Sequence, residues 1–305
     1  MIREYAIEPK ALNNWKDCRY ILEKFGFVNG RLISKFPKEW VKLVYSECSE
    51  LLPKEKKRTS EFLLRAKKHL IAANRNYNRN LDWLPNAEEQ HETKPFHAII
   101  ATSNPNMNAD VVTKDELDEE HPLLQCDGCL TIERKATQMA ECVAPILTIS
   151  KRIILVDRYF SKMQQRHFRP LNEFLRVIEN SQANAVLQTI EYHCEETDAL
   201  DNFEQAVIEH VSGSIPKGIK LAIIGWPKGS LHNRYILTNR GGVMFGTGLD
   251  DDNRGGGTRT DVVTRLDYYT FRNLWGEYAD CGRAPSFEVK GIEHPDEIDV
   301  RSGTS

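Results

Sequence analysis

The chain has 305 residues, a formal net charge of −3, and 28% charged and 40% hydrophobic residues. This composition allows one large or two ordinary globular domains with a real core, and it excludes a uniformly basic protein, so any anionic ligand must meet a local patch. The sequence contains no apolar run long enough for a transmembrane helix and no apolar signal region at its start. Its seven cysteines at irregular positions indicate a reducing compartment, so we expect a cytoplasmic protein.

Residues 1–90 carry apolar residues at helical spacing, around 9–25, from Pro37 onward and over 53–73. We therefore predict a small helical N-terminal domain, with a polar boundary near residues 74–95. The third helix is basic, with Lys54, Lys56, Lys57, Arg58, Arg65, Lys67 and Lys68. The segment after it adds two more basic and two aromatic residues, Arg75, Tyr77, Arg79 and Trp83. This mixture suits a nucleic-acid backbone, although a solvated helix face is the commoner explanation.

Residues 91–288 alternate between short β-branched runs and amphipathic segments. The expected strands are 97–101, 152–157, 185–192, 220–225 and 261–266, and the expected helices are 133–150, 171–180, 200–211 and 268–278. This alternation predicts an α/β domain with a mixed, largely parallel sheet covered by helices on both faces. In such sheets, ligand sites gather beyond the carboxyl ends of the strands. We expect residues 289–305 to form a flexible tail.

The segment 231–250, L-H-N-R-Y-I-L-T-N-R-G-G-V-M-F-G-T-G-L-D, is the most informative stretch. It predicts a β-hairpin whose Gly-Gly pair supplies positive φ in the turn 239–242. His232 and Arg234 are two residues apart, so on a strand they would point to the same face. A His and an Arg beside the small-residue elbow 246–248 indicate a phosphate site.

This spacing resembles the phospholipase D superfamily signature, H-x-K-x4-D-x6-G-S/T. His232 falls on the family's His, Arg234 on its Lys, Asn239 on its Asp and Gly246-Thr247 on its Gly-Ser, while Leu249 stands where the family usually has a later Asn. The form H-x-R…G-x-G-L-D is similar to the phospholipase D-like domain at the C-terminus of MIT-domain proteins. It also resembles related bacterial domains that are often encoded among phage-defence genes.

The resemblance implies a phospholipase D-like fold and a metal-independent phosphodiesterase without a cofactor, which we interpret as a nuclease in a bacterial defence setting. His232 would form a phosphohistidine, and the Arg234 side chain would clamp the phosphate. Because the chemistry uses two histidines and the chain has one motif, the second would come from a homodimer or from His193. The remaining predicted site residues orient the imidazole (Glu191, Asp157) or bind phosphate (Thr247, Gly246, Gly248, Asn239).

The Lys→Arg and Asp→Asn departures favour an alternative, a non-catalytic module that binds nucleic acid, phospholipid or a partner protein. With either function, the helical N-terminal domain is expected to contact other components of a defence system.

Two further motifs have competing interpretations. Cys126 and Cys129 form a C-x2-C pair, but the spacing to other ligands is not typical of zinc, so we expect a solvent-facing turn. The run 250–257, D-D-D-N-R-G-G-G, lacks the carboxylate alternation and the distal Glu of a calcium loop. A mobile loop over the site, with Asp250 capping the turn or orienting Arg234, is the preferred interpretation.

Overall fold

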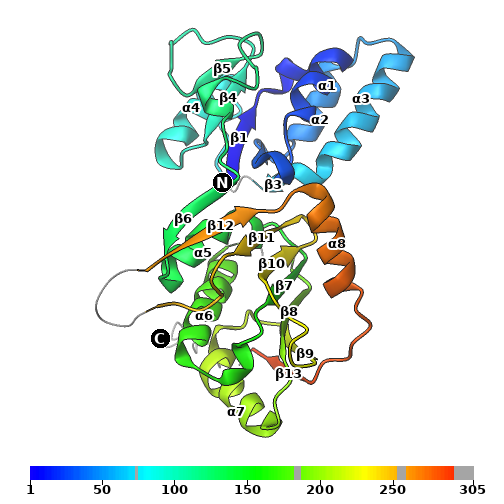
Figure 1. Cartoon of the computed structure of the whole chain (residues 1–305). Helices are drawn as coiled ribbons and strands as arrows, with labels where there is room; N and C mark the ends of the chain where they lie inside the picture. Colours follow the sequence, from blue (N-terminus) through cyan, green and yellow to red (C-terminus); the bar gives the residue numbers. More distant parts are fainter. Residues whose placement is uncertain (73–74, 182–186, 253–258, 292–305) are drawn as a thin grey trace, which may run out of the picture. The chain divides into compact units, whose positions relative to one another are not determined.

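The computed structural model describes residues 1–72, 75–181, 187–252 and 259–291 (Figure 1). Two compact units are present. The first comprises residues 1–132, 237–246 and 261–278, and the second comprises 133–236, 247–260 and 279–305. No helix in the described ranges is long and apolar enough to cross a membrane.

The first unit contains a five-stranded parallel sheet with the order β3-β2-β1-β4-β5. Its strands are β1 (Arg3–Ile7), β2 (Arg31–Lys35), β3 (Leu70–Ala72), β4 (Ala98–Ala101) and β5 (Val111–Thr113). The helices of this region are α1 (Trp15–Glu23), α2 (Trp40–Glu47), α3 (Pro53–Ala66) and α4 (Trp83–Thr93). β1 lies between strands that follow it in sequence on both sides, so the chain winds in two directions from it.

Each face of this sheet has its own apolar core. Tyr5 and Ile7 of β1 pack in the core that α1, α2 and α3 supply, where Trp40 and Leu63 are buried. Ala6, the β1 residue between them, packs with Trp83 of α4 on the other face. Helices therefore cover both faces because strand side chains alternate.

The N-terminal prediction needs correction. The three helices are present, but residues 1–90 are not only helical, because β1, β2 and β3 run between them. The predicted boundary near residue 90 is also wrong, because β4 pairs with β1 and β5 pairs with β4. These strands have three to five residues, too few for a two-residue period to stand out from the neighbouring helical pattern.

The second sheet has eight strands in the order β13-β9-β8-β7-β10-β11-β12-β6. β7 (Arg152–Val156), β8 (Thr189–Glu195) and β9 (Lys220–Trp226) are parallel. The sheet is mixed because β13 (Phe287–Lys290) pairs antiparallel with β9. β11 and β12 are also antiparallel. The remaining strands are β6 (Cys129–Glu133), β10 (Arg234–Thr238), β11 (Gly241–Phe245) and β12 (Thr260–Arg265).

Four helices accompany this sheet: α5 (Ala136–Leu147), α6 (Gln165–Asn180), α7 (Leu200–Val211) and α8 (Tyr268–Ala279). α6 packs between α5 and α7 beside β7, β8 and β9 (Figure 1). The expected α/β class is confirmed, and the structure adds β6 and β13. Of the predicted tail 289–305, Val289 and Lys290 belong to β13, and residues 292–305 lie outside the described residues.

The hairpin differs from its predicted form. Its tight turn is Asn239-Arg240, and Gly241 and Gly242 belong to β11 without positive φ. Gly241 is required for another reason. A Cβ there would lie 2.0 Å from a ring carbon of Phe27, so the bare backbone makes room for that ring.

Candidate functional site

Asp157 follows the carboxyl end of β7 and is fully buried. Its Oδ1 accepts a hydrogen bond from the Tyr159 backbone N–H at 2.9 Å. Its Oδ2 accepts one from the Leu249 N–H at 2.8 Å. The Asp157 carboxylate therefore joins the end of β7 to the segment after the elbow. These two backbone partners assign it to holding the elbow, and neither of them is the His232 imidazole.

Gly248 belongs to the same arrangement. A Cβ on Gly248 would lie 2.3 Å from Oδ1 of Asp250 and 3.3 Å from Oδ2 of Asp157. Two carboxylates thus approach the bare backbone of this residue. The second glycine of the G-T-G-L-D sequence is therefore needed because a larger side chain would collide with these carboxylates.

The three aspartates after the elbow pair with arginines. Asp250 accepts a hydrogen bond from Arg134 at 2.5 Å and forms an ion pair with Arg166 at 3.4 Å. Asp251 accepts hydrogen bonds from Nε and Nη2 of Arg169 at 2.7 and 2.5 Å, and Asp252 forms an ion pair with Arg259 at 3.0 Å. Because these carboxylates neutralise guanidinium groups, they are not arranged as calcium ligands, and Asp250 does not orient Arg234. Residues 253–257 of the predicted loop lie outside the described residues.

Glu191 and His193 lie on β8 and bind each other. The Arg152 guanidinium donates to both Glu191 oxygens at 2.7 and 3.1 Å. His193 Nε2 lies 3.2 Å from the same carboxylate, and Trp226 Nε1 donates to His193 Nδ1 at 3.0 Å. Nδ1 is therefore an acceptor, and the proton of a neutral imidazole resides on Nε2.

The two pKa shifts agree with this assignment. Burial lowers the pKa of His193 despite its carboxylate neighbour, so the ring stays neutral near pH 7. Burial opposes ionisation of Glu191, but hydrogen bonds from His193 and Arg152 together bring the pKa of Glu191 below its usual value. The His193 side chain is fully buried. In this conformation it cannot reach a phosphorus atom outside the protein.

Arg234 starts β10 and stacks on an aromatic ring. Its guanidinium carbon lies 5.4 Å from the centroid of Tyr159. The Lys162 ammonium is 4.2 Å from the same centroid, and the guanidinium carbon of Arg158 is 4.9 Å from it. We call these four residues the Tyr159 cation cluster. Three cations around one ring concentrate positive charge at this place.

The charges of this cluster are only partly balanced. Arg158 pairs with Glu195 at 3.1 Å. Within the described part of the chain, neither Lys162 nor Arg234 has a carboxylate partner. Two positive charges are therefore available to an anion.

His232 lies beside Arg234 but not on the strand. β10 begins at Arg234, and Asn233 forms a bend between the two residues. The predicted shared strand face is therefore wrong. The two residues are in contact through a hydrogen bond instead, because the Arg234 guanidinium donates to the His232 backbone carbonyl at 3.1 Å. The His232 side chain is exposed, and its imidazole forms no hydrogen bond to any described residue.

The remaining predicted phosphate ligands divide between the units. Thr247 and Gly248 belong to the second unit, with Thr247 exposed. Asn239 and Gly246 are also exposed and belong to the first unit. Within the second unit, Arg234 is thus joined to the loop after β7 through Tyr159, whereas Glu191 and His193 form a separate buried pair.

Sequence reasoning missed Lys162 and His167. Lys162 follows Tyr159 by three residues, at the end of a 3-10 turn, and this spacing places it at the same ring. His167 is buried near Asp157 and Asp250, and both of its ring nitrogens lack a hydrogen-bond partner in the described chain. Burial lowers the pKa of His167, so its ring stays neutral near pH 7.

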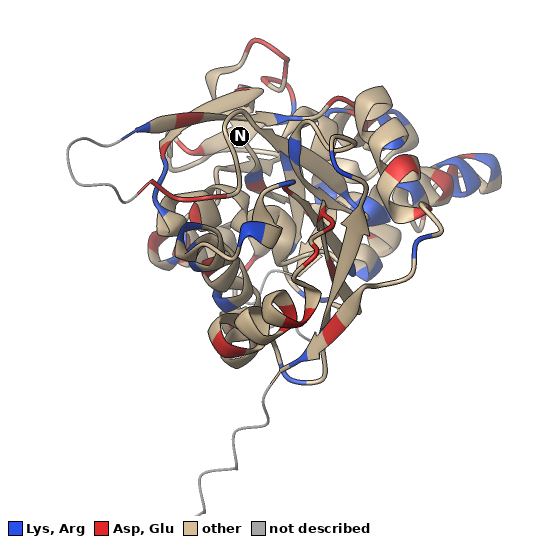
Figure 2. Ribbon diagram, turned by 60° about the horizontal axis from the view of Figure 1, so that its bottom comes forward, with Lys and Arg blue, Asp and Glu red and all other residues tan. Residues whose placement is uncertain are grey.

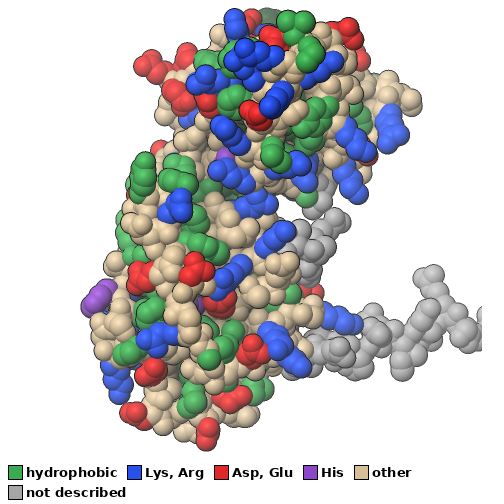
Figure 3. All heavy atoms as spheres, turned by 90° about the vertical axis from the view of Figure 1, so that its right-hand side faces the viewer, with side chains coloured by type: hydrophobic (Ala, Val, Ile, Leu, Met, Phe, Trp, Pro, Cys, Tyr) green, Lys and Arg blue, Asp and Glu red, His purple; other side chains and the backbone are tan. Residues whose placement is uncertain are grey.

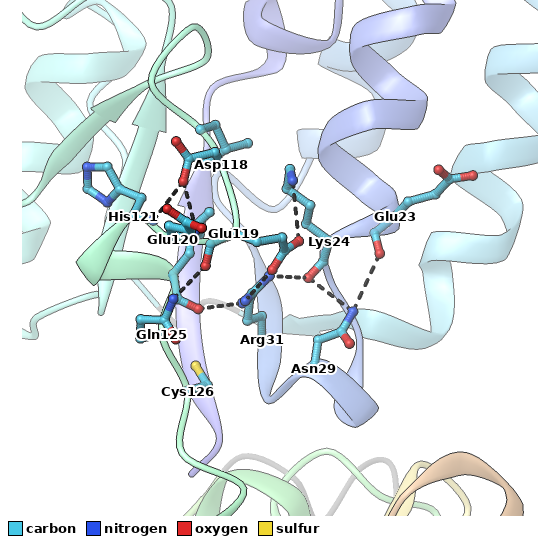
Figure 4. Close-up of polar contacts among 12 residues, drawn as sticks. Glu23, Lys24, Asn29, Arg31, Asp118, Glu119, Glu120, His121, Gln125 and Cys126 are labelled. Atoms are coloured by element: carbon cyan, nitrogen blue, oxygen red, sulfur yellow. Dashed lines mark hydrogen bonds and ion pairs between the residues drawn. The ribbon is translucent and has the colours of Figure 1, made fainter.

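Cys126, the first residue of the C-x2-C pair, lies at the end of a loop that Arg31 holds in place (Figure 4), and Cys129 begins β6. The buried Arg31 guanidinium donates to the Leu124 carbonyl at 2.8 Å and to the Glu119 carboxylate at 2.9 Å. Cys126 Sγ lies 3.5 Å from the Tyr5 hydroxyl, and Cys129 is exposed. No group of three or more His, Cys, Asp or Glu side chains in the described ranges could hold a metal ion.

Comparisons with known proteins do not identify a family. No protein-family model matches the chain, and no curated protein matches it. Among solved structures, it is similar to TrmBL2, described as an archaeal chromatin protein with a novel mode of DNA binding, at 12% identity and a TM-score of 0.29. That match covers 53% of this chain and 55% of the TrmBL2 chain, so it spans about half of each protein.

Proposed function

We propose that the second unit is a non-catalytic module that binds the phosphate groups of nucleic acid at the Tyr159 cation cluster. The observation that carries the proposal is the pair of unbalanced charges on Lys162 and Arg234, held over one aromatic ring. An arginine fork and a lysine ammonium bind phosphate oxygens in complementary ways. Cations gathered at one place suit the closely spaced phosphates of a nucleic acid.

The histidines favour binding over hydrolysis. A nucleophilic imidazole is normally oriented by a second group on its other nitrogen. His232 lacks such a partner among the described residues, while His193 has one but is fully enclosed. The module therefore keeps the groups that attract phosphate without the arrangement that activates a nucleophile.

A metal-independent nuclease is the second candidate, because the exposed His232 lies next to Arg234 and is open to solvent. This candidate requires a homodimer that brings two His232 side chains together. Sedimentation of the full chain at micromolar concentration would measure that dimer, and a monomer that cleaves DNA or RNA would contradict the paired-histidine mechanism.

Binding of a fluorescein-labelled thymidine trinucleotide to the full chain tests the proposed module. Arg234→Ala and Lys162→Ala should each weaken binding about tenfold, which corresponds to about 1.4 kcal/mol. The matched control is Lys217→Ala, which removes an exposed lysine of the same unit. Equal weakening in all three variants would reject a specific site.

A cleavage assay separates the two candidates. Plasmid, single-stranded DNA and RNA should remain intact in the presence of the protein, with and without EDTA. Cleavage that survives EDTA and disappears in His232→Ala would replace the binding module with the phosphohistidine nuclease. Cleavage that EDTA abolishes would replace both with a metal-dependent enzyme.

A further inference from the structure

The outer side of α3 carries a concentrated positive charge. Residues 53–69 contain seven Lys or Arg and two Glu, a net of +5, whereas the whole chain carries −3 and the rest of it therefore −8. All seven basic side chains are exposed: Lys54, Lys56, Lys57, Arg58, Arg65, Lys67 and Lys68. Figure 2 shows α3 at the right with basic residues predominating. Figure 3 shows basic side chains gathered at the top of the side that carries α3.

None of these seven cations pairs with a carboxylate in the described ranges. Two of the arginines contact aromatic rings instead. The Arg58 guanidinium lies 4.7 Å from the centroid of the Trp15 ring, and the Arg65 guanidinium lies 5.7 Å from that of Phe62. Like charges close together repel one another and cost stability. The chain as a whole is acidic, yet these basic side chains of α3 lack carboxylate partners in the described ranges. Such a surface is suited to binding a polyanion.

The helix presents four of these charges on one side. With 100° per residue, Lys54, Lys57, Arg58 and Arg65 fall within an arc of about 100°. Thr59, Leu63 and Ala66 are buried on the opposite side. We call these four residues the α3 basic face. It is about 17 Å long, the length of about five steps of a nucleic-acid duplex.

The same burial argues against a membrane as the partner. An amphipathic helix that binds a bilayer inserts its apolar side between the lipids. Leu63 and Ala66 are part of the unit's own core, and the exposed large apolar side chain of α3 is a single leucine, Leu64. One leucine does not make the continuous apolar side that such an insertion needs. The predicted aromatic residues after the helix do not contribute either, because Trp83 is buried and donates to the Phe36 carbonyl at 2.9 Å.

We infer that the α3 basic face is a second, sequence-independent binding surface for the phosphate backbone of double-stranded nucleic acid. This inference uses residues of the first unit only and does not rest on the Tyr159 cation cluster. Lysine and arginine contacts to successive phosphates release counterions, so binding here should depend steeply on salt.

The test is the salt dependence of binding to a labelled 20-base-pair DNA duplex, measured on the full chain. The triple variant Lys54→Ala, Lys57→Ala and Arg65→Ala should make the slope of log affinity against log salt shallower by about 2–3. The control triple variant Lys10→Ala, Lys38→Ala and Lys94→Ala removes the same charge from exposed lysines of the same unit outside α3. It should leave the slope unchanged.

Three outcomes overturn the inference. Equal effects of both triple variants would assign binding to net charge, and an unchanged slope in the α3 triple variant would remove the surface. Loss of binding to phosphatidylserine vesicles in the α3 variant, with duplex binding intact, would assign the face to a membrane. Failure of the Tyr159 cation cluster is a separate result, because Arg234→Ala should reduce trinucleotide binding without changing the contribution of α3 to the duplex slope.

Discussion

His69 should make the stability of the protein depend on pH. Its imidazole ring packs against Gly26, where an added Cβ would lie 2.9 Å from Cε1. Burial is the main cause that lowers the pKa of His69 to about 4, and the charges of Lys68 and Arg240 lower it further. The unfolded chain has the ordinary value of 6.5, so it binds the proton more tightly than the folded chain.

The sign and size follow from this difference. The stabilisation is complete above pH 6.5 and is lost as the pH falls toward 4, because the unfolded state gains a proton first. A gap from 6.5 to about 4, with about 1.4 kcal/mol for each pH unit, predicts a loss of about 2–3 kcal/mol between pH 7.5 and pH 4.5. His69→Gln should remove this part of the pH dependence.

Urea unfolding at pH 7.5 and at pH 4.5 measures the effect. For each protein, the free energy of unfolding at pH 4.5 is subtracted from that at pH 7.5. The difference between wild type and His69→Gln in this loss reports on His69, because the other buried histidines contribute equally to both proteins. His232→Gln is the matched control at an exposed position and should behave as wild type. If His69→Gln loses as much stability as wild type on acidification, the burial argument is refuted.

Three further substitutions test the packing around the sites by thermal unfolding. Gly241→Ala should lower the free energy of unfolding by about 1–3 kcal/mol because the new Cβ would meet the Phe27 ring. Adding Phe27→Ala should recover the part of this loss that comes from the clash. An unchanged unfolding temperature in Gly241→Ala would contradict the close approach. Asp157→Asn should lower the free energy of unfolding by about 1.5–3 kcal/mol, because the amide keeps one acceptor oxygen while its NH2 group cannot accept the second backbone N–H; a stable variant would show that the carboxylate does not hold the elbow. Trp226→Phe should cost about 1 kcal/mol by removing the donor to His193 Nδ1, and no change would argue against that hydrogen bond.

Long periodic segments were predictable from the sequence alone. The predicted helix 200–211 is α7, and the predicted strands 152–157 and 220–225 are β7 and β9 within one residue at their ends. A helix with about three turns of apolar spacing, or a β-branched strand with a buried apolar run, contains enough residues for its period to be recognised. The short strands β3 and β5 lack that length, and their place in a sheet depends on partners far away in sequence.

The sequence identified the residues of the motif, whereas the tertiary structure determines which side chains they contact. The sequence placed Arg234 next to His232 and beside an elbow of small residues. Only the fold placed Arg234 over Tyr159 with Lys162, and only the fold enclosed His193 between Glu191 and Trp226. Local spacing determines which side chains share a turn or a strand. Burial, ion pairing and the approach of a glycine backbone to a distant ring depend on how the elements pack.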